Sequence, residues 1–232
     1  MPTPPLSRRA LLRSTAAGLL YPTARAWGAS ARVTVEDWSL APVGSRGVPP
    51  GWQKYETPGG HPAYNLTVVE EPGRRYLHMK SAGERSTIAK EVGADLAVTP
   101  VLAWQWRVLS LPRGADLRRR ATSDATGHIF AVWPRFPALA RSRLIGYVWD
   151  PTLPVGTTIG SQKTETVTFI VVRRGDPEPG RWLHERRNVA EDYRRVFGEA
   201  PPPLPVVALS IDTNDTRSPA EAAFGRIELE PS

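Results

Sequence analysis

Apolar and polar residues alternate along most of the chain, and the pattern is clearest over residues 101–108. There Leu102, Trp104 and Trp106 fall on one face of an extended segment, and Arg107 falls on the other. Successive side chains of a β-strand point to opposite faces, so this segment predicts a strand with one buried face. The two Trp side chains fit a packed core, and the alternative is a flat platform on which a sugar ring stacks.

The same reasoning applies to the rest of the chain, where short segments of period two are separated by Gly and Pro. Strands are predicted over residues 33–38, 64–70, 76–80, 86–92, 126–133, 143–150, 166–173, 182–187, 205–212 and 223–229. Residues 71–74 (Glu-Pro-Gly-Arg) predict a hairpin turn between two of these strands. The continuous apolar character of 166–173 predicts a strand buried on both faces.

One internal segment has the helical period. Asn188 is a suitable N-cap, Val189, Tyr193 and Phe197 share a face, and Gly198 is suited to the residue after the helix. We therefore expect an all-β protein, a jelly-roll-like antiparallel β-sandwich with one short helix near 189–197.

The composition agrees with this architecture. The 19 Gly and 24 Pro residues are scattered, which is typical of many turns between short strands. A length of 232 residues suits one good-sized core, and we expect residues 32–232 to form a single domain.

The first 31 residues have the pattern of a twin-arginine signal peptide. Arg8 and Arg9 precede a modest apolar segment, residues 11–21, and residues 29–31 (Ala-Ser-Ala) resemble a cleavage site. The apolar segment is shorter than the ~20 residues that span a bilayer. We expect a periplasmic or secreted protein with no transmembrane segment after cleavage. The alternative is a chance Arg pair in a basic arm.

Removal of this leader changes the charge of the protein. The formal net charge is +7, and the leader holds four Arg residues and no acidic residue, which leaves 26 basic and 23 acidic residues, a net charge of +3. This balance indicates no nucleic-acid partner. The chain has no Cys, so neither disulfides nor thiolate chemistry contribute.

Common catalytic motifs are missing from the sequence. No zincin motif, P-loop, dinucleotide fingerprint or Gly-x-Ser-x-Gly elbow occurs, and the four His residues lie in separate segments. We expect no cofactor apart from a structural calcium ion held by Asp212, Asn214 and Asp215, whose oxygens suit a hard cation. The alternative for these three residues is a hydrogen-bonded turn that closes a hairpin.

Several segments resemble an uncharacterised family of exported bacterial proteins, domain of unknown function 3047. The resemblance covers the mature chain and rests on residues 102–108, 111–112, 114–116, 147–150, 185–189, 192–193, 197–198 and 212–216. Arg226 departs from the pattern, because an acidic residue is expected there, and this weakens a calcium site built on that strand. The resemblance implies a jelly roll similar to carbohydrate-binding modules and to some lyases and glycosidases.

Two functions follow as hypotheses. The first is non-catalytic binding of a polysaccharide or small polar ligand, with aromatic stacking and polar hydrogen bonds. Its candidate residues are Trp106, Arg107, Trp149, Asp150, Glu185, Arg187, Asn188 and Asp192. The second is a polysaccharide hydrolase or lyase, which requires paired carboxylates in a cleft. A structural alternative is that Glu185, Arg187 and Asp192 form an ion-pair network that fixes the helix to the sandwich.

Overall fold

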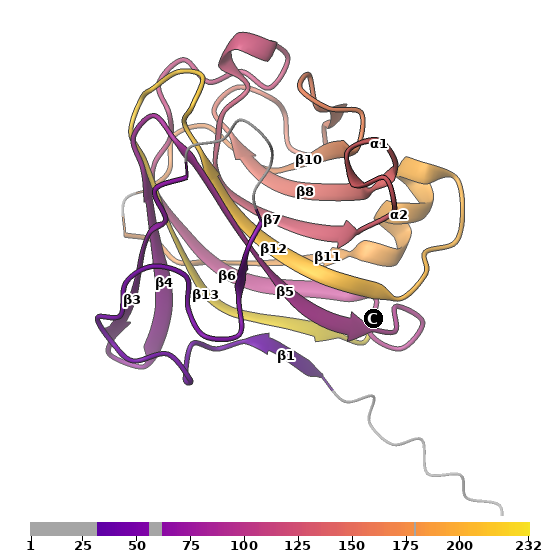
Figure 1. Cartoon of the computed structure of the whole chain (residues 1–232), viewed down its shortest axis with the longest axis horizontal. Coiled ribbons are helices and arrows are strands. Elements are labelled where there is room, and N and C mark those ends of the chain that lie inside the picture. The colour runs from indigo at the N-terminus through magenta and orange to yellow at the C-terminus, as the bar shows by residue number, and fades with distance from the viewer. Residues whose placement is uncertain (1–31, 56–61, 179) are drawn as a thin grey trace, which may run out of the picture.

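The computed structural model describes residues 32–55, 62–178 and 180–232, in which two β-sheets face each other (Figure 1). The expected signal peptide, residues 1–31, lies outside the described residues. The expectation of a jelly-roll-like sandwich is confirmed.

The six-stranded sheet contains β1 (Val33–Glu36), β3 (Asn65–Glu71), β4 (Arg74–Ser81), β6 (Val101–Ser110), β11 (Leu183–Asn188) and β13 (Ala220–Glu230). Its order is β11-β6-β13-β4-β3, with β1 paired to β13. The predicted hairpin is present, because β3 and β4 pair antiparallel across the turn at Pro72 and Gly73.

The seven-stranded sheet contains β2 (Gln53–Lys54), β5 (Arg85–Ala94), β7 (Ala125–Trp133), β8 (Arg143–Asp150), β9 (Thr158–Gly160), β10 (Val167–Arg174) and β12 (Leu204–Asp212). Its order is β2-β5-β12-β7-β8-β10-β9.

One pair of strands departs from the antiparallel expectation, because β8 and β10 run parallel. The chain leaves β8, forms β9 at the sheet edge and returns antiparallel to β9 as β10. This return places β10 between β8 and β9 in the same direction as β8. Strands β2 and β9 were not predicted, because they are two and three residues long and too short to show alternation. A short helix α1 (Ala138–Arg141) and a 3₁₀ turn at Arg120–Thr122 complete the elements.

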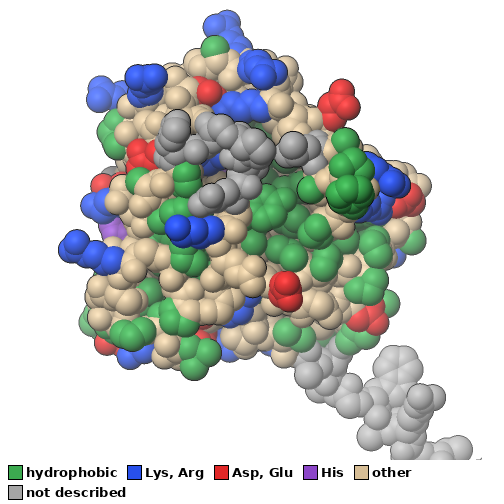
Figure 2. All heavy atoms as spheres, viewed as in Figure 1, with side chains coloured by type: hydrophobic (Ala, Val, Ile, Leu, Met, Phe, Trp, Pro, Cys, Tyr) green, Lys and Arg blue, Asp and Glu red, His purple; other side chains and the backbone are tan. Residues whose placement is uncertain are grey.

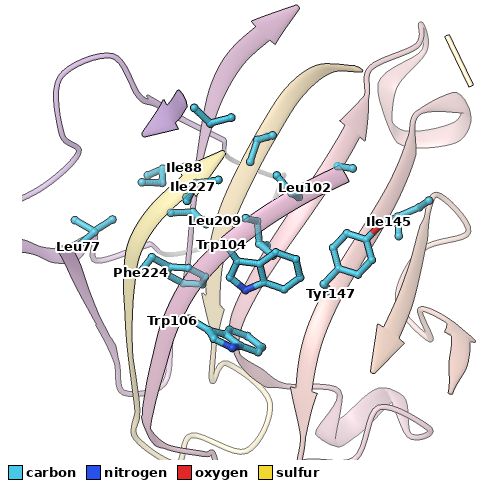
Figure 3. Packing of buried hydrophobic residues seen from close by; sticks show 14 of the residues in the cluster. Leu77, Ile88, Leu102, Trp104, Trp106, Ile145, Tyr147, Leu209, Phe224 and Ile227 are labelled. Carbon is cyan, nitrogen blue, oxygen red and sulfur yellow. The ribbon is translucent and has the colours of Figure 1, made fainter. Parts of the chain in front are cut away.

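The core lies between the sheets and is rich in aromatic rings. Trp104 and Trp106 of β6 are fully buried and point toward Tyr147 of β8 (Figure 3). The Trp104 ring stacks on Tyr147 with centroids 5.5 Å apart, and Trp106 packs on Trp149 at 5.7 Å. The core interpretation of this Trp pair is therefore confirmed, and neither ring presents a face to solvent.

Helix α2 (Val189–Phe197) forms as predicted. The Asn188 side chain accepts a hydrogen bond of 3.0 Å from the backbone N–H of Glu191, which satisfies a free donor of the first turn. Gly198 ends the helix with φ +72°, a conformation that a Cβ disfavours. Within the described residues, no helix is long and apolar enough to cross a membrane.

Candidate ligand-binding site

The candidate residues from the sequence are held mainly by contacts with each other. Trp106 Nε1 donates a hydrogen bond of 3.1 Å to Glu185 Oε1, and Arg173 of β10 donates two hydrogen bonds to the same carboxylate. Glu185 therefore links β11 to β10, and does not pair with the helix as one sequence interpretation proposed. Arg107 lies on the outer face of the six-stranded sheet, over the rings of Tyr76 and Trp182.

Asp192 joins helix α2 to the sandwich. Its carboxylate accepts hydrogen bonds of 3.0 and 2.7 Å from Arg187, one of 2.9 Å from the Tyr147 hydroxyl, and one from Arg195. Burial raises the pKa of Tyr147 well above its ordinary value, so this hydroxyl remains a donor. The interpretation of Arg187 and Asp192 as an ion pair that fixes the helix is confirmed, and Asn188 serves as its N-cap.

Asp150 has a local structural role at the end of β8. Its side chain accepts backbone hydrogen bonds of 2.7 Å from Thr152 and 2.6 Å from Leu153, which stabilise the turn after the strand. Trp149 donates to the Gly175 carbonyl at 2.7 Å and lines a small depression with Arg173. A ligand-binding role for these sequence candidates stays a prediction. None of them lines a pocket of about 510 Å³ that lies on the outer face of the seven-stranded sheet.

Asp212, Asn214 and Asp215 converge on the ammonium group of Lys163, and a calcium ion held by these residues stays a prediction. The Lys163 Nζ lies 3.6 Å from Asp212 Oδ2 and 3.1 Å from Asn214 Oδ1, and it also contacts Asp215. Among the described residues, no group of three or more His, Asp or Glu side chains could hold a metal ion. Here a side chain supplies the positive charge that these oxygens require.

A pocket of about 510 Å³ lies on the outer face of the seven-stranded sheet. Figure 2 shows hydrophobic side chains gathered beside a hollow on this face of the molecule. The apolar lining comes from Phe130, Ala138, Leu144, Val167, Phe169 and Ala208. These residues belong to a second buried apolar cluster, or lie beside it, on the side of the sheet away from the inter-sheet core.

The pocket floor depends on Gly146, which lies between Phe130 and Phe169 in neighbouring strands. A Cβ on Gly146 would meet Phe130 Cε1 at 2.6 Å and Phe169 Cδ1 at 2.9 Å. Both rings therefore lean over the bare backbone of β8, and any larger residue would displace them. His128 lies beside them, with centroids 5.4 Å from Phe130 and 5.6 Å from Phe169.

Polar groups surround the other part of the pocket. Ser210 and Thr87 share a hydrogen bond of 2.7 Å, and Asp212 follows Ser210 on the same face of β12. Burial raises the pKa of Asp212 to about 6, against the smaller opposing influence of Lys163. Burial also lowers the pKa of His128 to about 4, so its ring is neutral at physiological pH. The site thus combines an aromatic floor with hydroxyl and carboxyl groups.

Sequence reasoning did not find this pocket, although one signal was present. Segment 126–133 has apolar residues on both faces of the strand, since Phe130 points away from the core while its neighbours Ile129 and Ala131 point into it. In a two-sheet sandwich only one face of a strand packs on the opposite sheet. Apolar residues on the other face therefore indicate that further groups pack on the outer face of the sheet. Which residues on other strands join Phe130 depends on register, which the sequence does not show.

Comparisons with known proteins yield one family and several distant structures. Residues 50–228 match the family described as "Protein of unknown function (DUF3047)". No curated protein matches the chain.

Three solved structures cover most of the chain at low identity. A family 30 carbohydrate-binding module of a Clostridium thermocellum cellulase has 10% identity and a TM-score of 0.47, over 87% of this chain and 98% of that chain. A family 11 module from the same organism, in complex with a mixed-linked tetrasaccharide, has 8% identity and a TM-score of 0.45, over 87% and 96%. The xyloglucanase domain of a Sinorhizobium fredii effector, in complex with cellobiose, has 8% identity and a TM-score of 0.45, over 83% and 97%. At this distance they carry no inference about a ligand of this chain.

Proposed function

The chain belongs to the DUF3047 family, and we propose that it binds a carbohydrate without catalysis, in the pocket on the outer face of the seven-stranded sheet. The observation that carries this proposal is the pair of Phe rings over Gly146 beside a row of hydroxyl and carboxyl groups. A sugar ring has an apolar C–H face and a polar edge, so it requires both kinds of surface in one site.

The apolar face of the sugar would lie against Phe130 and Phe169. Both rings line the pocket, with centroids 6.2 Å apart and planes tilted by 56° to each other, so together they offer an angled aromatic floor. The ring hydroxyls would hydrogen-bond to Ser210, Thr87 and Asp212 along the polar part of the pocket. A volume of about 510 Å³ lies within the range of small-molecule sites, and it suits one or two sugar units.

The site of action that we propose is the periplasm or the extracellular space. The support is the Arg8-Arg9 pair with its apolar segment and small-residue cleavage pattern. A carbohydrate is a common ligand in that compartment, and a domain without Cys needs no disulfide to fold before export.

The test uses residues 32–232 on a glycan array, followed by calorimetry with the strongest binder. Phe130→Leu and Phe169→Leu keep an apolar side chain but remove the aromatic face, and each should weaken binding at least tenfold. The control is Trp182→Leu, which removes an aromatic ring from the opposite sheet, where it contacts Arg74 and Arg107. Absence of any glycan binding, or equal affinity in the Phe variants and the control, would overturn the proposal.

One observation favours the second candidate, a hydrolase or lyase on the same scaffold. Asp212 lines the pocket with a pKa raised to about 6, a value that suits an acid or base near neutral pH. A glycosidase of the usual kind needs a second carboxylate. The neighbouring Asp124 accepts backbone hydrogen bonds from Asp215 and Thr216, which commits it to a turn. Release of reducing ends or unsaturated products, abolished by Asp212→Asn, would establish the enzyme instead.

A further inference from the structure

The outer face of the seven-stranded sheet changes from apolar to polar along three neighbouring strands, and to charged along two of them. Ala89 of β5, Ala208 of β12 and Phe130 of β7 are cross-strand partners and form an apolar row. Two positions away on each strand, toward the C-terminal end of β12, the next partners form a polar row.

That polar row consists of Thr87, Ser210 and His128. Beyond it, Arg85 and Asp212 are paired across β5 and β12 and form a charged row. Residues i and i+2 of a strand share a face, so the apolar, polar and charged rows lie one after the other on the same surface of the sheet. The pocket therefore has a polar end and an apolar end.

A side-chain bridge lies at the charged end of the pocket. Lys163, from the segment between β9 and β10, extends to Asp212, Asn214 and Asp215 at the end of β12. The Lys163 side chain is three-quarters buried, and this pairing with acidic groups compensates for that burial.

Lys163 also borders two depressions. It lines the pocket of about 510 Å³ together with Ser161 and Asp212. It also lines a second depression of about 450 Å³ together with Arg120, Asn214 and Asp215. Lys163 is the residue that the two linings share.

We propose, on the basis of the carbohydrate-binding function above, that the pocket receives the end of a glycan chain, and that the Lys163 bridge prevents a chain from continuing beyond the charged row. The terminal sugar lies with its C–H face on Phe130 and Phe169. Its outermost hydroxyls reach Ser210 and Asp212, and the remaining units leave the pocket past the apolar row. The ligand class is thus a short oligosaccharide or a chain terminus, in contrast to the interior of a polymer.

Chain-end recognition has a measurable signature, since only the first one or two units make contacts. Calorimetry with residues 32–232 would use homo-oligosaccharides of glucose, xylose and mannose, each from one to six units. For the sugar that binds, affinity should reach a plateau at two units and change less than twofold from two to six units.

The variant Lys163→Ser removes the bridge and should join the two depressions. The affinity for the hexamer should then rise at least fivefold relative to the dimer, since further units gain contacts with the second depression. The matched control is Lys80→Ser, on the opposite sheet, where Lys80 pairs with the partly exposed Glu221. It should leave the length dependence unchanged. A thermal unfolding scan would show that each variant is folded, and Asp215→Ala provides a second way to release the bridge.

Three results would overturn this inference. The first is an affinity that rises tenfold or more from dimer to hexamer in the unaltered protein, which indicates a through-going groove and leaves the carbohydrate function intact. The second is an unchanged length dependence in folded Lys163→Ser and Asp215→Ala. The third is no binding of any member of the series or of the glycan array, which removes the carbohydrate function itself.

Discussion

Gly146 lies directly under the ring of Phe130, so closely that a Cβ on Gly146 would stand 2.6 Å from Phe130 Cε1. Its backbone dihedrals are ordinary for a strand, so Gly is required here for space and not for conformation. The glycine thus lets the two Phe rings form the pocket floor.

The substitution Gly146→Ala should push the rings of Phe130 and Phe169 into the pocket. We expect a loss of about 1–3 kcal/mol in the free energy of unfolding, typical of overpacking, and at least a tenfold loss of glycan affinity. Denaturant titration and calorimetry measure the two effects. Gly160→Ala is the control, because nothing lies within 4 Å of its Cβ position, and it should change neither quantity appreciably. Glycan affinity equal to that of the unaltered protein would show that the rings are not the floor of the site.

A second prediction concerns Asp192, a candidate ligand residue that the structure places in an ion-pair network. Asp192→Ala leaves Arg187 and the Tyr147 hydroxyl without their acceptor. We expect a loss of about 2–4 kcal/mol in the free energy of unfolding, because one partner of a largely buried network is removed. Glycan affinity of the folded variant should not change.

The matched control for this prediction is Glu178→Ala, which removes an exposed ion pair with Arg181 and should cost less than about 1 kcal/mol. If Asp192→Ala instead keeps its stability and loses glycan binding, the sequence hypothesis of a site at Asp192 regains support.

The sequence was sufficient for the parts of the structure that depend on local pattern. Strand β6 follows from its alternation, and helix α2 follows from Asn188, its apolar face and Gly198. Each of these features is determined by residues within a few positions of each other, so a single segment carries the information.

The pocket depends on register between strands that are distant in sequence. Phe130 and Phe169 meet over Gly146 only because β10 pairs parallel to β8, a connection that alternation alone does not predict. Likewise, nothing in the sequence indicated that Lys163, some fifty residues earlier, would pair with Asp212 and Asp215. Such pairings are decided by tertiary packing, which no local signal encodes.

A third prediction tests the helix cap. Asn188→Ala removes the acceptor for the Glu191 N–H and should lower the free energy of unfolding by about 1 kcal/mol. Asn188→Ser keeps a side-chain oxygen at this position and should retain most of the stability. Urea denaturation of the two variants provides the measurement. Equal losses in both would indicate that the cap contributes nothing and that another property of Asn188 matters.

A fourth prediction concerns export. Replacement of Arg8 and Arg9 together by Lys keeps the charge of the leader but removes the paired guanidinium groups that define a twin-arginine signal. In a bacterial host, the unaltered chain should appear in the periplasm with its N-terminus near residue 32, and the double variant should remain uncleaved in the cytoplasm. Fractionation and N-terminal sequencing test this. The control is Arg25→Lys, which should export normally.

The last prediction follows from the raised pKa of Asp212. Burial raises this pKa from 3.8 to about 6, so between these two values the folded protein binds a proton that the unfolded chain does not. The contribution of Asp212 to stability therefore becomes less favourable as pH rises from about 4 to about 6, and it stays unfavourable above that. The full effect is about 3 kcal/mol at most.

His128 acts in the opposite direction over an overlapping range, because burial lowers its pKa from 6.5 to about 4 and its protonation destabilises the folded state as pH falls. The effect of Asp212 must therefore be isolated by comparison. We expect Asp212→Asn to be more stable than the unaltered protein at pH 7.5, by an amount that shrinks toward pH 4, as measured by urea denaturation at each pH. A stability difference that does not vary with pH would show that the pKa of the Asp212 carboxyl is not raised in the folded protein.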